Sequence, residues 1–276
     1  MTISAPEDPD DRGHGVGISQ LPPELILQIL DIAAASSTAT ALALCRVSSW
    51  AKSTAQPRLL HAVALSTDRQ LHAFERAILT ARYGAPQLAM VRYLWLHADM
   101  YYLDLPAHFP HLLELALTPM HLLQAALEAP VPAPRVTLLP LPPLHAARPL
   151  AELCSLARTD PAVLARVTHL SCALLDTMAL PLLPAFPHLT HLAVSGEYPR
   201  AELEELCVGA RSLRALILVL YTDVDRGFLA ALRERFPNVY VLEGEGHATV
   251  EGWLEKARAG DGFWDRAVRL CDEMET

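Results

Sequence analysis

Apolar residues recur in a fixed pattern along most of the chain. The pattern runs apolar, two variable positions, apolar, one variable position, apolar, and both FPHLLELAL (109–117) and FPHLTHLAV (186–194) contain it. Seven copies are found, the last of them incomplete, and their middle apolar residues are Leu94, Leu115, Leu139, Leu170, Leu192, Leu216 and Leu242. Successive middle residues lie 21 to 31 positions apart. Such a period is typical of a chain built from stacked structural repeats.

Each copy of the pattern predicts one short strand followed by a helical return. The alternation predicts a strand because every second side chain of a strand points to the same face. Between the strands, residues 70–82 place Leu71, Phe74 and Ile78 on one side of a helix. Segments 160–166 and 199–210 begin with residues that favour helix starts, an aspartate before a proline in one and a proline in the other. We therefore expect an α/β fold in which short parallel strands alternate with helices.

The strand predicted at ALILVL (215–220) differs from the others. It is apolar at both alternating positions, which indicates burial on both faces of the sheet. Large apolar residues near the C-terminus are available to cover it, namely Trp253, Leu254, Phe263, Trp264 and Val268. We expect this C-terminal segment to cover the strand and to cap the open end of the repeat stack.

The block LPPELILQIL (21–30) predicts an amphipathic helix ahead of the repeats. Prolines suit a first helical turn, and Glu24 complements the helix dipole. We assign its broad apolar face to Leu21, Leu25, Ile26, Leu27, Ile29, Leu30 and Ala33. A second helix is expected through Leu42, Leu44 and Val47, and a third from Ser48 to Trp50 onward. Three short helices cannot bury all of this apolar surface, so we expect either the neighbouring domain or another protein to cover it.

Composition adds limits to this picture. The chain is 52% hydrophobic and 19% charged, with a formal net charge of -9. A large core is expected, and the acidic balance argues against general nucleic-acid binding, which relies on a basic surface. Because no apolar run reaches membrane-spanning length and no secretory signal is apparent, we expect no membrane association. The five scattered cysteines are expected to be reduced thiols of an intracellular protein.

Candidate catalytic chemistry is sparse. The HxxH pairs His108–His111 and His188–His191 both enter a predicted strand, so we interpret them as copies of the repeat and not as metal ligands. EGEGH (243–247) is expected to form a turn. The proline-rich stretch 129–149 is expected to be a stiff loop with one strand, although it also fits a polyproline ligand. With no phosphate loop, nucleophile elbow or HExxH motif, we expect neither an enzyme nor a cofactor nor a metal site.

Several motifs together carry a resemblance to a known family. LPPEL (21–25), the pair Ile29–Leu30 and the ending VSSW (47–50) resemble an F-box, a three-helix motif that docks on the Skp adaptor of cullin-RING ubiquitin ligases. The repeats resemble irregular leucine-rich repeats. AQPRLLHAVAL (55–65), where such chains enter their first strand, and GDGFWDRA (260–267) are similar to segments of basidiomycete fungal F-box proteins. The resemblance covers nearly all of the chain after residue 18.

The resemblance implies a domain order and a function. The regions would be a disordered leader at 1–17, an F-box-like unit at 18–56, a leucine-rich-repeat-like domain at 57–246 and a helical C-terminal cap at 247–276. The protein would be a cytoplasmic or nuclear substrate adaptor that joins a Skp-family subunit and the cullin scaffold to an unknown protein target. An interaction scaffold without ligase function stays open as an alternative, since only two residues separate Val47 from Trp50, where family members usually have three.

Two sets of binding residues follow. The adaptor-binding set, transferred by position, is Leu21, Pro22, Leu25, Ile29, Leu44, Val47 and Trp50. In a repeat strand the residues between the core leucines face the other side of the sheet. They give a target-binding set of Tyr93, Trp95, Glu114, His169, Ser171 and His191, unless a loop or terminal segment covers them.

Overall fold

The computed structural model describes residues 21–80, 84–96, 108–139, 143–173, 183–195, 200–220, 226–243, 250–259, 262–267 and 269. The chain divides into two compact units, Met1–Gln56 and Pro57–Thr276, and each is described by itself. The leader predicted to be disordered at 1–17 lies outside the described residues, as do Val268 and most of EGEGH. None of the described helices combines the length and the apolar character that a membrane crossing needs.

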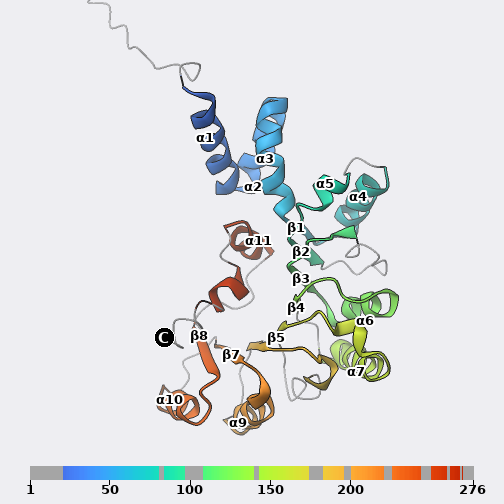
Figure 1. Ribbon diagram of the computed structural model, residues 1–276, viewed down its shortest axis with the longest axis vertical. Helices are drawn as coiled ribbons and strands as arrows, with labels where there is room; N and C mark the ends of the chain where they lie inside the picture. Colours follow the sequence, from blue (N-terminus) through green and yellow to red (C-terminus); the bar gives the residue numbers. More distant parts are fainter. Residues whose placement is uncertain are drawn as a thin grey trace, which may run out of the picture. The chain divides into compact units, whose positions relative to one another are not determined.

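The first unit consists of three helices, as the pattern predicts (Figure 1). They are α1 (Pro23–Ser36), α2 (Thr38–Val47) and α3 (Ser49–His61), the last of which runs on into the second unit. Extended residues at Ser37 and Ser48 separate them. The Ser37 hydroxyl accepts a hydrogen bond from the Thr40 amide at 3.1 Å, and Ser48 does the same for the Ala51 amide at 3.1 Å. Serine therefore stops one helix and starts the next at both junctions.

The interior of the first unit is made of small residues. Its buried residues, each at most 2% exposed, are Ala34, Ala41, Ala51 and Ala55. Alanine allows helices to approach closely, but each alanine contributes little apolar area to the core. The larger side chains on the same helices are therefore left partly or largely exposed.

The second unit contains an eight-stranded parallel sheet in which each strand pairs with the next one in the chain (Figure 1). The strands are β1 (Ala62–Leu65), β2 (Tyr93–Leu96), β3 (Glu114–Leu117), β4 (Arg135–Leu138), β5 (His169–Ala173), β6 (His191–Ser195), β7 (Ala215–Leu220) and β8 (Val239–Glu243). The helices are α4 (Asp68–Leu79), α5 (Ala85–Leu88), α6 (Pro119–Glu128), α7 (Pro143–Thr159), α9 (Arg200–Gly209), α10 (Arg226–Arg235) and α11 (Val250–Ala259). Short 3-10 turns lie at η3 (Pro161–Leu164), η4 (Leu183–Ala185) and η5 (Ala210–Ser212). The expected alternation of parallel strands and helices is confirmed.

Two predicted copies of the pattern are shifted in the structure. Val136 pairs with Leu115 and Leu170, so it takes the middle position that the pattern gave to Leu139. In the last copy Val239, paired with Leu216, takes the place given to Leu242. Both segments carry apolar residues at both alternating positions, and the pattern therefore fits them in two registers. The sheet also contains β1, which precedes the first of the seven copies of the pattern and was not counted among them.

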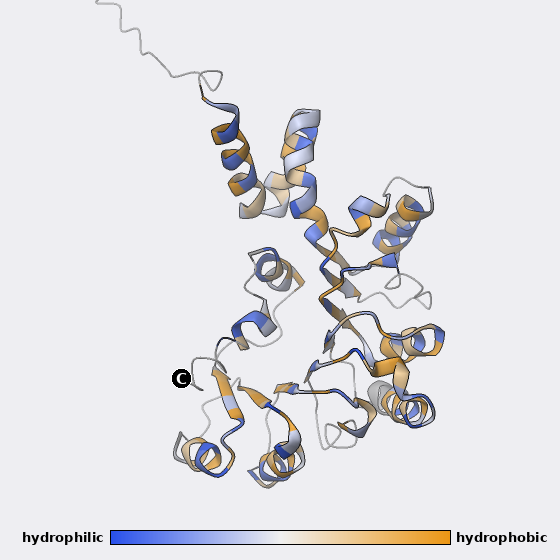
Figure 2. Ribbon diagram, viewed as in Figure 1, coloured by the Kyte–Doolittle hydropathy of each residue, from blue (hydrophilic) through white to orange (hydrophobic). Residues whose placement is uncertain are grey.

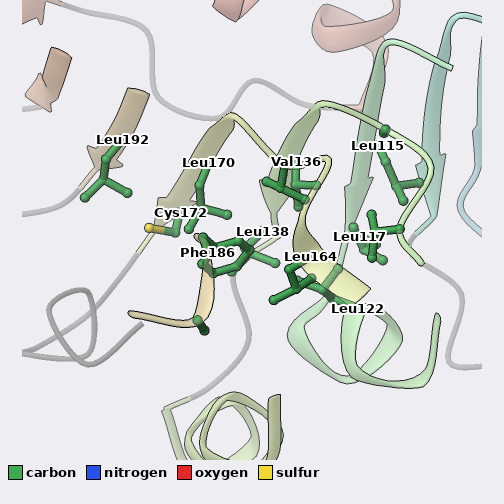
Figure 3. Packing of buried hydrophobic residues seen from close by; sticks show 14 of the residues in the cluster. Leu115, Leu117, Leu122, Val136, Leu138, Leu164, Leu170, Cys172, Phe186 and Leu192 are labelled. Atoms are coloured by element: carbon green, nitrogen blue, oxygen red, sulfur yellow. The ribbon is translucent and has the colours of Figure 1, made fainter. Parts of the chain in front are cut away.

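One face of the sheet holds the main core. Its inward side chains pack against the helices, and Leu115, Leu164 and Leu170 are completely buried. Figure 3 shows this layer, with Leu122 of α6 and Phe186 filling the space beside the strands. The strand residues coloured apolar in Figure 2 follow the sheet through all its repeats. This cluster includes no residue of α11 or of residues 262–267.

The opposite face of the sheet is also covered. Trp264 packs with Ile217 and Val219 of β7, so the prediction that 215–220 is buried on both faces is confirmed for Ala215–Val219. Trp253 and Ala257 of α11 pack beside β1, β2 and β3. The C-terminal segment thus covers the strand as expected. Its contacts lie on the face of the sheet and reach from β1 to β8.

Candidate functional site

Helix α1 is apolar on two sides, and only one of them packs. Ala34 is buried and Ile26 and Leu30 are half-buried on the side toward the other helices. Leu25 and Ile29 are 45% and 53% exposed on the other side. Together with Ile32, which is 70% exposed, they form a stripe at the i, i+4, i+7 spacing of a helix. The single broad face predicted from the sequence therefore splits into a packed side and a solvent-facing stripe.

The other two helices of the first unit add further exposed apolar side chains. Leu42 is 50%, Val47 is 73% and Trp50 is 42% exposed. Of the predicted adaptor-binding set, Leu21 and Leu44 are half-buried and the remaining members are exposed. The set omitted Leu27, Ile32 and Leu42, although helical spacing from Leu25 and Ile29 already pointed to Ile32. Exposed apolar residues at this density mark surfaces that contact other proteins.

The predicted target-binding residues are not exposed. Tyr93, Trp95 and His191 are each 5% exposed, and Glu114 and Ser171 are each 1% exposed, while His169 is half-buried. The expectation of an open recognition surface at these positions is therefore wrong, and the C-terminal segment contacts four of them, namely Tyr93, Trp95, Glu114 and His169. The alternative that a terminal segment covers them holds. We call residues 250–259 and 262–267 the covering segment, and the sheet face beneath it the covered face.

Glu114 lies at the centre of the covered face and contacts the covering segment. Its Oε1 accepts hydrogen bonds from Trp253 Nε1 and from Thr137 Oγ1, both at 3.2 Å. Complete burial raises the pKa of Glu114 to about 7, although these two hydrogen bonds and the nearby Arg135 oppose the shift. A carboxyl group with this pKa changes its charge near neutral pH.

Asp265 of the covering segment forms the second polar contact. Arg135 Nη1 donates to Asp265 Oδ1 at 2.7 Å, and the Tyr93 hydroxyl donates to Asp265 Oδ2 at 3.3 Å. The two partner side chains come from β4 and β2. Burial, together with the carboxylates of Asp265 and Glu114, raises the pKa of Tyr93 to about 12, so the phenol keeps its proton. One carboxylate thus joins the covering segment to two strands.

Two histidines stack on the covered face. The rings of His169 and His191 lie 4.2 Å apart and 3° from parallel, and Trp264 packs edge-on against His169 at 5.0 Å. The Thr168 hydroxyl lies 2.8 Å from His169 Nδ1 and 3.2 Å from the Pro134 carbonyl oxygen, so it holds the His169 ring in place. Burial, and next the neighbouring His191, lower the pKa of His169 to about 3, which keeps the ring neutral.

Histidine and cysteine side chains are common metal ligands and nucleophiles. The described residues contain no group of three histidine, cysteine or acidic side chains arranged to hold a metal ion. In the second HxxH pair, His188 is exposed and His191 is buried, so the two rings do not share an environment. Burial raises the pKa of Cys172 to about 12 and that of Cys207 to about 11. These two thiols are protonated at neutral pH and are poor nucleophiles.

No protein-family model matches the chain. No curated protein sequence matches it significantly either. The candidate surfaces are therefore interpreted from their residues and their geometry.

Proposed function

We propose that this protein is an F-box substrate-recognition adaptor of an SCF-type cullin-RING ubiquitin ligase. Its N-terminal helices bind a Skp-family adaptor subunit, and its leucine-rich repeats bind a protein target. The observation that carries the proposal is the exposed apolar surface of the three-helix unit, which includes Leu25, Ile29, Val47 and Trp50. These residues belong to the LPPEL motif, the Ile29–Leu30 pair and the VSSW motif by which the sequence resembles an F-box.

The interior of the unit supports this function. A three-helix unit that is stable alone normally places its largest apolar residues inside, whereas here alanines fill the interior and leucine, isoleucine, valine and tryptophan lie outside. A protein partner that covers the exposed side chains removes apolar area from water, and each large side chain contributes roughly 1.5–3 kcal/mol when fully buried. Binding therefore supplies the burial that the small interior lacks.

The protein itself performs no chemistry in this proposal. It acts in the cytoplasm or nucleus by holding the lysines of a target near a ubiquitin-carrying enzyme bound to the same cullin scaffold. Proximity of this kind raises the effective concentration of the reacting groups and accelerates transfer without a catalytic side chain in the adaptor.

Co-purification with a fungal Skp protein tests the proposal. We expect a complex at micromolar concentration, and we expect Leu25→Asp with Ile29→Asp to abolish it, because two carboxylates would be desolvated in the interface. Leu127→Asp is the matched control, since Leu127 is a comparably exposed (64%) aliphatic residue of α6 in the second unit. Wild-type protein that stays monodisperse and binds no Skp protein would instead favour a repeat scaffold without ligase function.

A further inference from the structure

The covering segment is attached to the sheet by its side chains. Trp253 donates to Glu114, and Asp265 accepts from Arg135 and Tyr93. Arg258 Nη2 donates to the Ala62 carbonyl at 3.2 Å. The hydrogen-bonded ladder of the sheet runs from β1 to β8, and none of these strands belongs to the segment. A segment held in this way can leave without breaking the hydrogen-bond ladder of the sheet.

The main core does not depend on the covering segment. That core lies on the other face of the sheet, between the strands and the helices α4 to α10, and it contains none of residues 250–267. The apolar contacts of the segment form separate, smaller clusters around Trp253, Ala257 and Trp264. Release of the segment therefore exposes one face of the sheet and leaves the larger core buried.

The contacts resemble those of a bound peptide more than those of a core. Trp253 packs on Trp95 at 5.3 Å and edge-on to Tyr93 at 6.2 Å, so an indole lies among the aromatic side chains of β2. A charged pair, Arg135–Asp265, lies beside these anchors and is about one quarter exposed. Aromatic anchors with an arginine contact nearby are the residues that dominate binding energy at protein interfaces.

The fit between segment and sheet is also incomplete. Glu114 is fully buried with a pKa raised to about 7, so at higher pH its charge is held away from water. Among the described residues, the buried indole nitrogens of Trp95 and Trp264 have no hydrogen-bond partner. Unpaired buried donors are rare in a permanent core. A ligand that pairs with the indole nitrogen of Trp95, which lies on the sheet, would compete with the covering segment.

We propose that the covered face is a peptide-binding surface and that the covering segment is its intramolecular ligand, which a target must displace. The target segment it fits presents an indole in place of Trp253 and a carboxylate in place of Asp265, to reach Glu114 and Arg135. This inference rests on the proposed function in one respect, because it names the surface by which the repeats bind a protein target. The occupied state prevents target binding until a competing segment arrives.

A labelled peptide tests the inference in the full chain. The probe is a fluorescein-labelled peptide with the sequence of residues 250–267, and its binding is measured by fluorescence anisotropy. The tethered segment of the wild type competes at high effective concentration. We therefore expect at least tenfold tighter binding to Trp253→Ala/Asp265→Ala protein than to wild type. Adding Arg135→Ala to that variant removes a contact on the sheet side and is expected to abolish the gain.

Peptide variants provide the matched controls. A peptide with Trp253→Ala is expected to lose binding, and one with Glu255→Ala is expected to keep it, because Glu255 is exposed on α11. Equal binding of the probe to the folded wild type and the folded double variant, or no binding to either, overturns the proposal.

Hydrogen exchange of the wild type decides the case if the double variant does not fold. We expect the amides of α11 to exchange at least tenfold faster than those of β3 and β5, through opening of the covering segment alone. Equal protection of the three elements shows that the segment is a permanent part of the fold. Co-purification of a Skp protein with the same samples is scored separately, so failure of the adaptor proposal is distinguished from failure of this one.

Discussion

The indole nitrogen of Trp253 donates a hydrogen bond to Glu114 Oε1 at 3.2 Å, across a sequence separation of 139 residues. This contact connects α11 to β3, and the second hydrogen bond to Oε1, from Thr137 at 3.2 Å, comes from β4. Glu114 is completely buried, and burial is the main reason why its pKa rises to about 7. The stability of this region therefore depends on pH in the physiological range.

Glu114 is expected to make the protein less stable as the pH rises through neutrality. Its folded-state pKa lies above its ordinary value of 4.5, so it stabilises the folded state fully below that value and loses this contribution as the pH approaches and passes about 7. Between pH 6.5 and 8 we expect a loss on the order of 1 kcal/mol in the free energy of unfolding. Urea denaturation at several pH values in this window measures it.

Glu114→Gln is the variant that isolates this effect. It keeps the shape of the side chain and an acceptor for Trp253, but it has no proton to lose, so it should lack the loss of stability that Glu114 causes between pH 6.5 and 8. His169 and His61, whose pKa values are lowered by burial, add stability as the pH rises through about 6.5, but they do so equally in both proteins, so the difference between the two pH slopes reports Glu114. An equal pH slope in the wild type and in Glu114→Gln would contradict the assignment.

The Arg135–Asp265 pair is expected to contribute more than an ordinary surface ion pair. Its side chains are 22% and 23% exposed, and the N–O distance is 2.7 Å. In a double-mutant cycle with Arg135→Ala and Asp265→Ala we expect a coupling of about 1 kcal/mol in urea denaturation. The control pair Arg148–Glu152 is 85% and 49% exposed at 2.8 Å, and its coupling should be clearly weaker because solvent screens it. Similar coupling energies for both pairs would show that Asp265 does not hold the covering segment in place.

The sequence predicted the alternation of strands and helices because each repeat contains its own local pattern. It predicted burial of 215–220 on both faces for the same reason, since the adjacent residues Leu216 and Ile217 are both apolar and lie on opposite faces of the sheet. It did not predict the burial of Glu114, because a glutamate in a strand normally faces water and no local signal marks a partner 139 residues away. The prediction that Tyr93 and Trp95 are exposed was wrong for the same reason, because Trp253 packs against both.

The apolar surface of α1 shows a second limit. Leu25 and Ile26 are neighbours in sequence and lie about 100° apart around a helix. The sequence shows that both are apolar, but the packing of α1 against α2 determines which of them is covered. Periodicity alone could not distinguish the exposed apolar residues from the packed ones. The resemblance to an F-box predicted five residues that are exposed, namely Pro22, Leu25, Ile29, Val47 and Trp50.

The alanine interior of the first unit leads to a paired prediction on adjacent residues. Ala41 is 1% exposed and Leu42 is 50% exposed. Ala41→Leu should force the helices apart and destabilise the unit by about 1–3 kcal/mol, whereas Leu42→Ala should change its stability by less than about 0.5 kcal/mol. Native-state hydrogen exchange of the amides in α1 to α3 measures both. Tolerance of leucine at position 41 would show that the interior is not closely packed.

The small number of lysines gives a test of the ligase assignment in a reconstituted reaction. The chain has Lys52 and Lys256 and no other lysine, and Lys52 is exposed on α3 while Lys256 is half-buried on α11. If the protein serves as a ubiquitin-ligase adaptor, its self-modification on lysine should occur mainly at Lys52. Lys52→Arg should remove most of it, and the control Lys256→Arg should remove little. Mass spectrometry of the modified chain locates the sites. The double Lys→Arg variant has no lysine to modify, so any lysine-linked ubiquitin signal in that sample comes from another protein, which the same spectra identify.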